Sequence, residues 1–590
     1  MFVRRFCLVI SWFALLSFAQ SGTAQISKGN LILIDRGVQL QSLLTPDNYF
    51  HSDTYSNAGY TTIAFGFDTT GNLGPIETFT GDAPGLPWSR WASDETNMPG
   101  MGIGFIGGDP GRPYSRTNEI PHFSQLVAVQ LGDEWNLNDD GWRTRLVNWF
   151  NATQTNWPNT ILYHNSYGSQ VGDAQLSDFT TRAHPDMLCF DTYPWQSVYD
   201  TNLPDHTGAP YGGPPTGWYG DLRRYREHAR SAGIPLALYR QTFHAVQDYD
   251  GHIFRDPSPS ELALETSVGL AFNAKFFTDF LYNAGAASLF TKTFNGSGDS
   301  VIATNGLYAE MADTNLRARN LGKALLRLKP IVNDLNTGFA TTSIMFVRGK
   351  VLSGGVTNRT AIPVGFIGDQ DTGGDNALYT DWVFARNDPY LSGFQAITNN
   401  GAKNNELAGD VIISWFQPLD NALLPTNVTN QIYMMVVNGL TDPTGTPAEC
   451  LQTISLDFTF AGNGTNGVVL LNPTTGLLQT NAPLPTVNGK RRLTLTLNGG
   501  DAALFKFHDG TAFMGFVPPQ APHLTAQMQG GFPAIKVEGR VADRCRIESS
   551  TSPNTNWTTV TNLILPSSPY IFTDTTAAGS QRFYRAVAIP

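Results

Sequence analysis

Residues 126–135 read LVAVQLGDEW, an unbroken apolar run that ends in two adjacent acidic residues and a tryptophan. A continuous apolar run, unlike an alternating one, is typical of a strand buried on both faces, as in a parallel sheet. Similar runs recur between residues 31 and 294, and most of them also end in polar or acidic residues. They lie at 31–35, 61–68, 101–109, 160–166, 186–191, 235–241 and 287–294.

Helical patterns separate the later runs. They cover residues 141–150 and 221–231. The SPSE sequence at 258–261 has the S-x-x-E spacing of a capping box, ahead of an apolar helix that should extend toward Gly285. A further helical pattern at 315–336 is placed to close the unit.

Eight strands with interleaved helices predict an α/β fold, a (β/α)8 barrel over residues 25–338. The alternation of strands and helices is weakest in the N-terminal part, where residues 69–100 are expected to form a loop. Beyond the barrel, short strands separated by Asn, Gly, Asp and Pro turns predict a β-sandwich at 339–512. Residues 513–524 are interpreted as a Pro-containing linker and residues 525–590 as a small C-terminal β module.

The first 24 residues predict a secretory signal peptide. Arg4 and Arg5 precede a short apolar run, and small residues follow it. The apolar run is too short to span a membrane comfortably, and no later segment offers about 20 apolar residues. We therefore expect a secreted or periplasmic protein without a transmembrane segment.

Composition excludes several classes of function. The net charge is −11 and no Lys/Arg run is present, which argues against nucleic acid as a partner. The four cysteines are scattered, and the ten histidines form no HxxxH or HxH pair, so neither a disulfide framework nor a metal site is expected. A GxGxxG match at 102–107 lies within a strand-like run and leads into no helix, so no dinucleotide cofactor is predicted. The oligomeric state stays open.

The residues that end the predicted strands carry the candidate chemistry, because active sites of such barrels lie at the C-terminal ends of the strands. Carboxylates with aromatic neighbours at these positions fit glycoside hydrolysis, in which one acid protonates the leaving oxygen while a second group attacks or activates water. The catalytic candidates are Glu134, Asp133 and Asp191. The candidates for substrate contact are Trp135, His164, Asn165, Tyr193, Trp195, Gln241, Asp35 and Trp88. Asp68 and Asp109 end the second and third predicted strands.

Three strand ends also carry a family resemblance. GDEW (132–135), FDTYPW (190–195) and LYRQTF (238–243) resemble exported bacterial barrel proteins related to clan A glycoside hydrolases, over about residues 30–330 and with a β-sandwich behind. The resemblance implies that Glu134 is the acid/base and that Asp133 replaces the family's Asn. It also implies that Gln241 occupies the position of the nucleophilic Glu. A glutamine cannot form the covalent glycosyl ester.

This departure leaves three alternatives. Asp191 is one candidate for the second catalytic carboxylate. Alternatively, the Asp133-Glu134 pair resembles that of N-acetylhexosaminidases, in which the acetamido group of the substrate is the nucleophile and the Asp orients it. In the third alternative the barrel binds carbohydrate without cutting it. The sequence thus predicts a secreted glycoside hydrolase in which Glu134, Asp191 and Gln241 open into one cleft, with Tyr193 and Trp195 on its wall.

Overall fold

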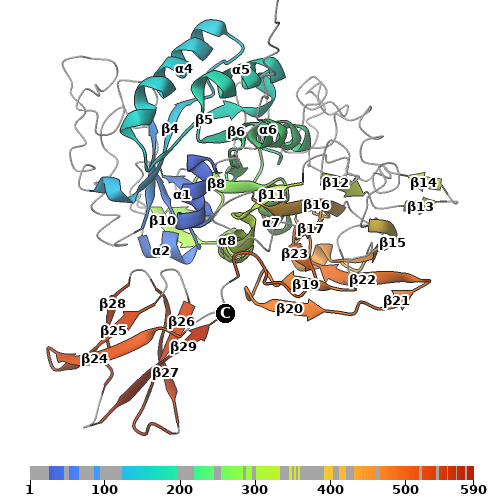
Figure 1. Ribbon diagram of the computed structural model, residues 1–590. Helices are drawn as coiled ribbons and strands as arrows, with labels where there is room; N and C mark the ends of the chain where they lie inside the picture. The colour runs from blue at the N-terminus through green and yellow to red at the C-terminus, as the bar shows by residue number, and fades with distance from the viewer. Residues whose placement is uncertain are drawn as a thin grey trace, which may run out of the picture.

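The computed structural model describes most of the chain (Figure 1). In the barrel region the described residues are 26–44, 52–65, 86–92, 122–195, 218–244, 254–282, 287–294 and 300–331. Further on they comprise short strands between 344 and 358, and residues 391–402, 411–419, 431–458, 466–516 and 521–589 apart from a few short gaps. The predicted signal peptide, the predicted strand at 101–109, Asp68 and Asp109 lie outside the described residues.

Eight parallel strands close into a barrel in sequence order, which confirms the (β/α)8 prediction. Helices cover the outside of this barrel, and Figure 1 shows three of them, α4, α5 and α6, beside β4, β5 and β6. The strands are β1 (Gln39–Leu44), β2 (Ile63–Phe65), β3 (Trp88–Ala92), β4 (Leu126–Asp133), β5 (Ile161–Tyr167), β6 (Met187–Asp191), β7 (Leu236–Gln241) and β8 (Ala274–Phe280). The longer helices are α4 (Asp140–Thr153), α5 (Asp173–Ala183), α6 (Trp218–Ala232), α7 (Pro259–Ala271) and α8 (Gly306–Leu325).

The first predicted strand is wrong: residues 31–35 belong to helix α1 (Lys28–Arg36). Ser27 caps this helix by accepting a hydrogen bond from the backbone N–H of Asn30. Leu33 packs with Ile161 and Met187, which lie at the N-terminal ends of their strands. The helix therefore covers the floor of the barrel. In so short a helix, an apolar run cannot be distinguished from a buried strand by periodicity.

The third and eighth predicted strands were also misplaced. β3 occupies residues 88–92, inside the stretch expected to be a loop. Residues 290–294 form β9 (Phe290–Phe294), an antiparallel hairpin with β10 (Ser300–Thr304), and not the last barrel strand. That strand is β8, which the sequence pattern assigned to the end of the preceding helix.

Buried charges concealed β8. Lys275 and Asp279 both lie in it, and both are almost completely buried. The Lys275 ammonium donates to Asn30 and to two backbone carbonyls, and Asp279 forms an ion pair with Arg240. Buried charges are tolerated when such partners are present, but a sequence pattern does not show the partners.

Helix α7 starts where predicted. Ser258 and Glu261 form the expected capping box, with Pro259 in the first turn. The helix ends at Ala271, well before Gly285. Its residues are buried nearly all round because the barrel lies on one side and a β-sheet on the other. An all-round buried helix has only a weak apolar stripe, which explains why its end was hard to place.

Two antiparallel sheets follow the barrel and enclose a second core. The larger contains β11 (Leu328–Pro330), β16 (Val411–Pro418), β17 (Tyr433–Asn438), β23 (Ala502–Phe507), β19 (Val468–Leu471) and β20 (Leu478–Asn481), with β12 (Ile344–Val347) paired to β16. The smaller contains β15 (Leu391–Asn399), β18 (Gln452–Phe458), β22 (Lys490–Leu497) and β21 (Thr486–Val487). Trp415 and Phe505 of the larger sheet share a core with Ile454 and Leu456 of the smaller.

The larger sheet also packs on the barrel. Ile412 and Met435 belong to the same core cluster as residues of α7 and α8, and Figure 1 shows β16, β17 and β23 beside these helices. Ser260 of α7 hydrogen-bonds the backbone of Asp442 in both directions. The barrel and this sheet therefore form one packed unit.

The chain ends in two three-stranded sheets. They are β24 (His523–Gln529), β25 (Phe532–Glu538) and β28 (Tyr570–Thr573), and β27 (Thr558–Ile564), β26 (Arg544–Ser550) and β29 (Phe583–Ile589). Ile535 and Ile547 lie in the small core that both sheets share. Among the described residues, no helix is long and apolar enough to cross a membrane.

Candidate active site

The backbone turns sharply at the end of β4, so that the side chains of Asp133 and Glu134 lie in different surroundings. Gly132 has φ +69°, and an added Cβ would lie 3.0 Å from the Trp135 ring, so only glycine fits there. Glu134 has φ +48°, and its N–H donates to the Asn165 carbonyl oxygen at 2.8 Å. The Glu134 side chain is exposed, whereas Asp133 is half-buried. A non-glycine residue with positive φ is uncommon, and such backbone is frequent at functional sites.

A bulge aims Asp133 into the barrel. The pairing of β4 with β5 shifts register between Gln130 and Asp133. Without a shift, residues three apart in a strand point to opposite faces. Here both contact each other, because the Gln130 Nε2 donates to Asp133 Oδ1 at 2.8 Å.

Three carboxyl groups meet at this end of the barrel: Asp133, Glu134 and Asp191. The Asn165 amide donates to Asp133 Oδ1 at 2.9 Å and to Asp191 Oδ2 at 3.0 Å, so these oxygens lie within two hydrogen-bond lengths of each other. Asp191 also has a hydrogen bond with the Glu134 carboxyl group. The structure therefore brings together the three residues predicted to be catalytic.

The three carboxyl groups cannot all be ionised at neutral pH. Burial, opposed by the Asn165 hydrogen bond and supported by the charge of Glu134, raises the pKa of Asp133 to about 7. Burial, followed by the charges of Glu134 and Asp133, raises the pKa of Asp191 well above its usual range. Like charges in a shared site disfavour each other, so the group retains protons that exposed carboxylates would lose.

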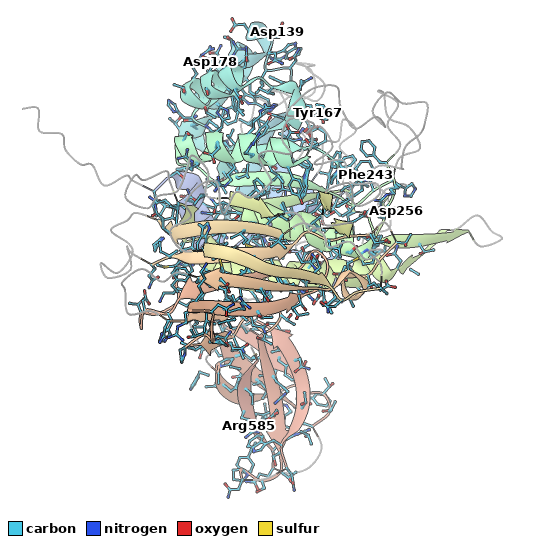
Figure 2. The ribbon with its side chains drawn as sticks, turned by 90° about the vertical axis from the view of Figure 1, so that its right-hand side faces the viewer. Asp139, Tyr167, Asp178, Phe243, Asp256 and Arg585 are labelled. Carbon is cyan, nitrogen blue, oxygen red and sulfur yellow. The ribbon has the colours of Figure 1, made fainter. Side chains whose placement is uncertain are left out.

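Tyr193 lies between these carboxyl groups and the aromatic rings of Phe243 and Phe254. Its ring lies 4.9 Å from that of Phe243 and 6.0 Å from that of Phe254. Burial and then the charges of Asp191, Glu134 and Asp133 raise the pKa of its phenol, so the hydroxyl stays protonated. Figure 2 labels Phe243 on the same side of the molecule as Tyr167, the last residue of β5, which marks the C-terminal end of the barrel.

No protein-family model and no curated protein matches this sequence. Solved structures with a similar fold include ScGas2 in complex with compound 6, and a mutant of Saccharomyces cerevisiae Gas2p in complex with laminaritetraose and laminaripentaose. Each is 11% identical to this chain, has a TM-score of 0.30 and covers 48% of the chain. The chain spans 65% and 64% of those proteins' lengths, which is less than two thirds. At this TM-score and identity the likeness supports no conclusion about the activity or the substrate of this chain.

Gln241 and Trp195 are buried, contrary to the prediction that they open into a cleft. Both side chains have no exposed surface. The Gln241 amide donates to the carbonyl oxygens of Trp195 and Arg255, each at 2.9 Å, and accepts from the Trp195 N–H at 2.8 Å. Glu265 of α7 accepts from the Trp195 indole and from the Gln241 N–H. The Gln241 side chain therefore connects the loop after β6 to the end of β7 through hydrogen bonds.

His164 and Trp88 are also wrong as substrate contacts. His164 points to the helix layer, between the rings of Trp135 and Phe179, because Asn165, the next residue, points inward. Burial lowers its pKa to about 4. Trp88 is fully buried, and its indole donates to the His122 carbonyl oxygen at 2.9 Å.

Asp35 and Trp135 lie away from the carboxyl cluster. Asp35 is on α1, at the floor of the barrel, so the prediction that it ends a strand beside the site is wrong. Trp135 is half-buried and folds back over Gly132, with its ring 5.1 Å from Trp142 and 5.7 Å from Trp149. Of the predicted contacts, Asn165 and Tyr193 are the two that adjoin the carboxyl groups.

Sequence reasoning missed Gln130 and Tyr239, which lie beneath the cluster. The Tyr239 hydroxyl donates to Gln130 Oε1 at 2.6 Å, and Gln130 in turn holds Asp133. Gln130 is the one polar side chain in the apolar run LVAVQL, and this could have drawn attention to it, since a buried polar side chain needs hydrogen-bond partners. Among the described residues, no group of three His, Cys, Asp or Glu side chains is arranged to hold a metal ion.

Placing a glutamate at position 241 should not create a nucleophile. In Gln241→Glu, a carboxyl group would face the carbonyl oxygens of Trp195, Phe243 and Arg255 instead of donating to them. We expect a loss of about 1–3 kcal/mol in the free energy of unfolding, larger at pH 8 than at pH 5, where the new acid keeps its proton. Urea unfolding at both pH values measures this. A stable variant with increased hydrolysis would contradict the assignment of Gln241 as structural.

Stability should fall as pH rises from 5 to 7. Burial raises the pKa of Glu265 to about 8 and that of Asp221 to about 7, so the folded chain holds protons there that the unfolded chain has released. Their contribution to stability is complete below the ordinary pKa of about 4 and is lost as pH rises toward these values, by at most about 1.4 kcal/mol per pH unit for each group. Buried His164, whose pKa burial lowers to about 4, opposes this trend below its ordinary pKa of about 6.5, but it is one group against Glu265 and Asp221 together. Buried Lys275, whose pKa burial lowers to about 7, acts in the opposite direction only above that pH.

The melting temperature at pH 5, 6 and 7 checks this prediction. The slope should be smaller in Glu265→Gln, which has no proton to release. A melting temperature that rises over this interval would contradict the burial of neutral acids in the fold.

Proposed function

We propose that this protein is a glycoside hydrolase that acts on an oligo- or polysaccharide, with Glu134 as its general acid/base. The observation that carries the proposal is the convergence of Asp133, Glu134 and Asp191 at the C-terminal end of the barrel. Glycosidic cleavage requires an acid close to a second carboxyl group or an equivalent nucleophile. In this cluster an exposed acid, Glu134, lies next to two acids that are more buried.

Glu134 is the member of the cluster that a substrate can reach. It is exposed, whereas Asp191 is 5% exposed. Burial, followed by the charges of Glu134 and Asp133, raises the pKa of the neighbouring Asp191 well above its usual range, so Asp191 can supply a proton to Glu134. In the proposed reaction, Glu134 gives that proton to the glycosidic oxygen as the bond to the anomeric carbon breaks.

The second group is not on β7, because the Gln241 amide is held by backbone groups. Asp133 and Asp191 are the remaining carboxyls for a direct mechanism. In a substrate-assisted mechanism, Asp133 would orient the acetamido group of an N-acetylated sugar. The Tyr193 hydroxyl, which stays protonated beside all three acids, is placed to donate a hydrogen bond to the sugar or to its acetamido oxygen.

The proposal includes export. Residues 1–24 would be removed as a signal peptide, and the barrel would meet its carbohydrate outside the cytoplasm. N-terminal sequencing of the secreted protein should then begin near Gln25. The β-sandwich and the C-terminal module would act as accessory domains.

The deciding experiment is a panel of aryl glycosides and polysaccharides, with and without N-acetyl groups, incubated with the wild-type protein and with Glu134→Gln. Release of product by the wild type alone supports the proposal. Inhibition by a thiazoline mimic, with activity only on N-acetylated sugars, indicates the substrate-assisted route. Cleavage of plain hexosides without thiazoline inhibition indicates a direct route.

A second candidate function is carbohydrate binding without catalysis. The observation that favours it is the buried, fully bonded Gln241 at the position of the family's nucleophile. In that case no member of the panel is cleaved, while calorimetry detects glycan binding that both the wild type and Glu134→Gln retain.

A further inference from the structure

We infer that Asp133 holds the negative charge of this site and that Asp191 holds its proton. Gln130 and Tyr239, beneath the cluster, are positioning residues that maintain this division. The inference rests on the proposed function and deepens it, because it names Asp133 as the carboxylate that faces the sugar.

Asp133 receives two amide donors on one oxygen. Asn165 Nδ2 donates to Asp133 Oδ1 at 2.9 Å, and Gln130 Nε2 donates to the same oxygen at 2.8 Å. The orientation of the Gln130 amide is fixed because the Tyr239 hydroxyl donates to its oxygen at 2.6 Å. The NH2 group of Gln130 must therefore face Asp133, and it favours the ionised form of that carboxyl.

Asp191 receives one amide donor. The other hydrogen of Asn165 Nδ2 goes to Asp191 Oδ2 at 3.0 Å, and the Cys189 thiol donates to Asn165 Oδ1 at 3.5 Å, which fixes the orientation of this side-chain amide as well. Asp191 Oδ1 is buried and receives no donor from the described part of the chain. A proton on this oxygen would give Asp191 a hydrogen bond to donate, and Glu134 is its carboxyl partner.

Burial acts in the same direction as the donors. Asp133 is half-buried, whereas Asp191 is 5% exposed and loses more hydration if it ionises. The pKa of Asp133 is raised to about 7 and that of Asp191 is raised well above its usual range, so Asp133 ionises first. The titratable groups that interact with the two acids are Glu134, Tyr193, Cys189, Tyr163, Tyr239 and Tyr225.

This division assigns a role to each acid. Asp191 passes its proton through Glu134 to the leaving oxygen as the glycosidic bond breaks, and the leaving alcohol departs with that proton. A water molecule then bonds to the anomeric carbon, and the proton that it releases returns through Glu134 to Asp191. Meanwhile the ionised Asp133 stabilises the positive charge that develops on the sugar.

Carboxyl NMR of protein labelled with 13C-aspartate tests where the charge lies. Burial raises the pKa of Asp221 to about 7 as well, so one resonance near pH 7 should belong to Asp221 and remain in both variants. We expect a second resonance that titrates near pH 7, that is absent from Asp133→Asn and that persists in Asp191→Asn. Because Asp191→Asn removes a neighbouring acid, the resonance should persist at a somewhat lower pH. Loss of this resonance in Asp191→Asn, with its retention in Asp133→Asn, would overturn the assignment.

Tyr239→Phe tests the positioning role. Without the hydroxyl, the Gln130 amide is free to turn, and the Asp133 titration should move upward by about 0.5 to 1 pH unit. Tyr163→Phe is the matched control, because the Tyr163 hydroxyl bonds to Thr278 and Gln41 and should leave the titration within about 0.2 unit. If Tyr239→Phe does not fold, Gln130→Met removes the same donor and should give the same upward shift. An unchanged titration in a folded Tyr239→Phe or Gln130→Met would refute the positioning role.

The titration needs no turnover, so the inference and the proposed function can fail separately. The expected titration with no hydrolysis of any glycan contradicts the function alone. Hydrolysis with the near-neutral titration assigned to Asp191 contradicts the inference alone. In an active protein, the acidic limb of the pH profile of kcat/KM should follow the same upward shift in Tyr239→Phe.

Discussion

Glu134→Gln should lower kcat/KM for glycan hydrolysis by about 10²–10⁴ while leaving glycan binding nearly unchanged. The substitution preserves the size of the side chain and its hydrogen bonding but removes the proton that the leaving oxygen must receive. Because Glu134 is exposed, the substitution should leave the fold unchanged. Steady-state kinetics on the best substrate of the panel, with calorimetry of binding, measures both quantities.

Asp35→Asn provides the matched control. Asp35 is an acid of the same barrel, but its side chain is 82% exposed on helix α1 at the opposite end. Its substitution should change neither kcat nor KM. Near wild-type turnover in Glu134→Gln would show that Glu134 is not the acid, and a large loss in Asp35→Asn would contradict the location of the site.

Asp279→Asn should destabilise the protein by about 3–5 kcal/mol, because it leaves a buried arginine without its counter-charge. Arg240 of β7 and Asp279 of β8 have no exposed surface, and their side chains meet at 2.5 Å. Arg240 also donates to Thr266 of α7 and Asn315 of α8, while Tyr60 donates to Asp279. The pair thus joins the last two barrel strands to the helices outside them.

Urea unfolding of Asp279→Asn beside Asp178→Asn checks this prediction. Asp178, which Figure 2 labels near the surface, forms ion pairs with Arg143 and Arg182, and pairs in such a position contribute little to stability. If Asp279→Asn lowered the free energy of unfolding as little as Asp178→Asn, other groups in the barrel would have to compensate the charge of Arg240.

The sequence predicted the four middle strands of the barrel closely. The runs at 126–134, 160–166, 186–191 and 235–241 coincide with β4 to β7 within one or two residues. Strands buried on both faces keep continuous apolar runs, and their polar ends mark where they stop. Because parallel strands share one direction, the acids that end β4 and β6 had to meet at one end of the barrel, whatever the details of packing.

Tertiary structure decided which polar residues belong to the site. A one-residue shift in the pairing of β4 with β5 aims Asp133 inward. The main chain of the loops after β6 and β7 covers Gln241, although its place at the end of β7 suggested a role in the cleft. Hydrogen bonds to backbone groups of distant segments determine these outcomes, and a side chain's identity does not encode them.

The sequence by itself thus determined the class of fold, the four central strands and the three carboxyl groups that converge. Only the tertiary structure decided that residues 31–35 form a helix under the barrel, that a strand with two buried charges completes it, and that Gln130 and Tyr239 support the acids from below. The physical reason is the range of the interactions. Apolar burial and strand direction act along contiguous residues, whereas the pairing of buried polar groups depends on partners that only the closed barrel brings together.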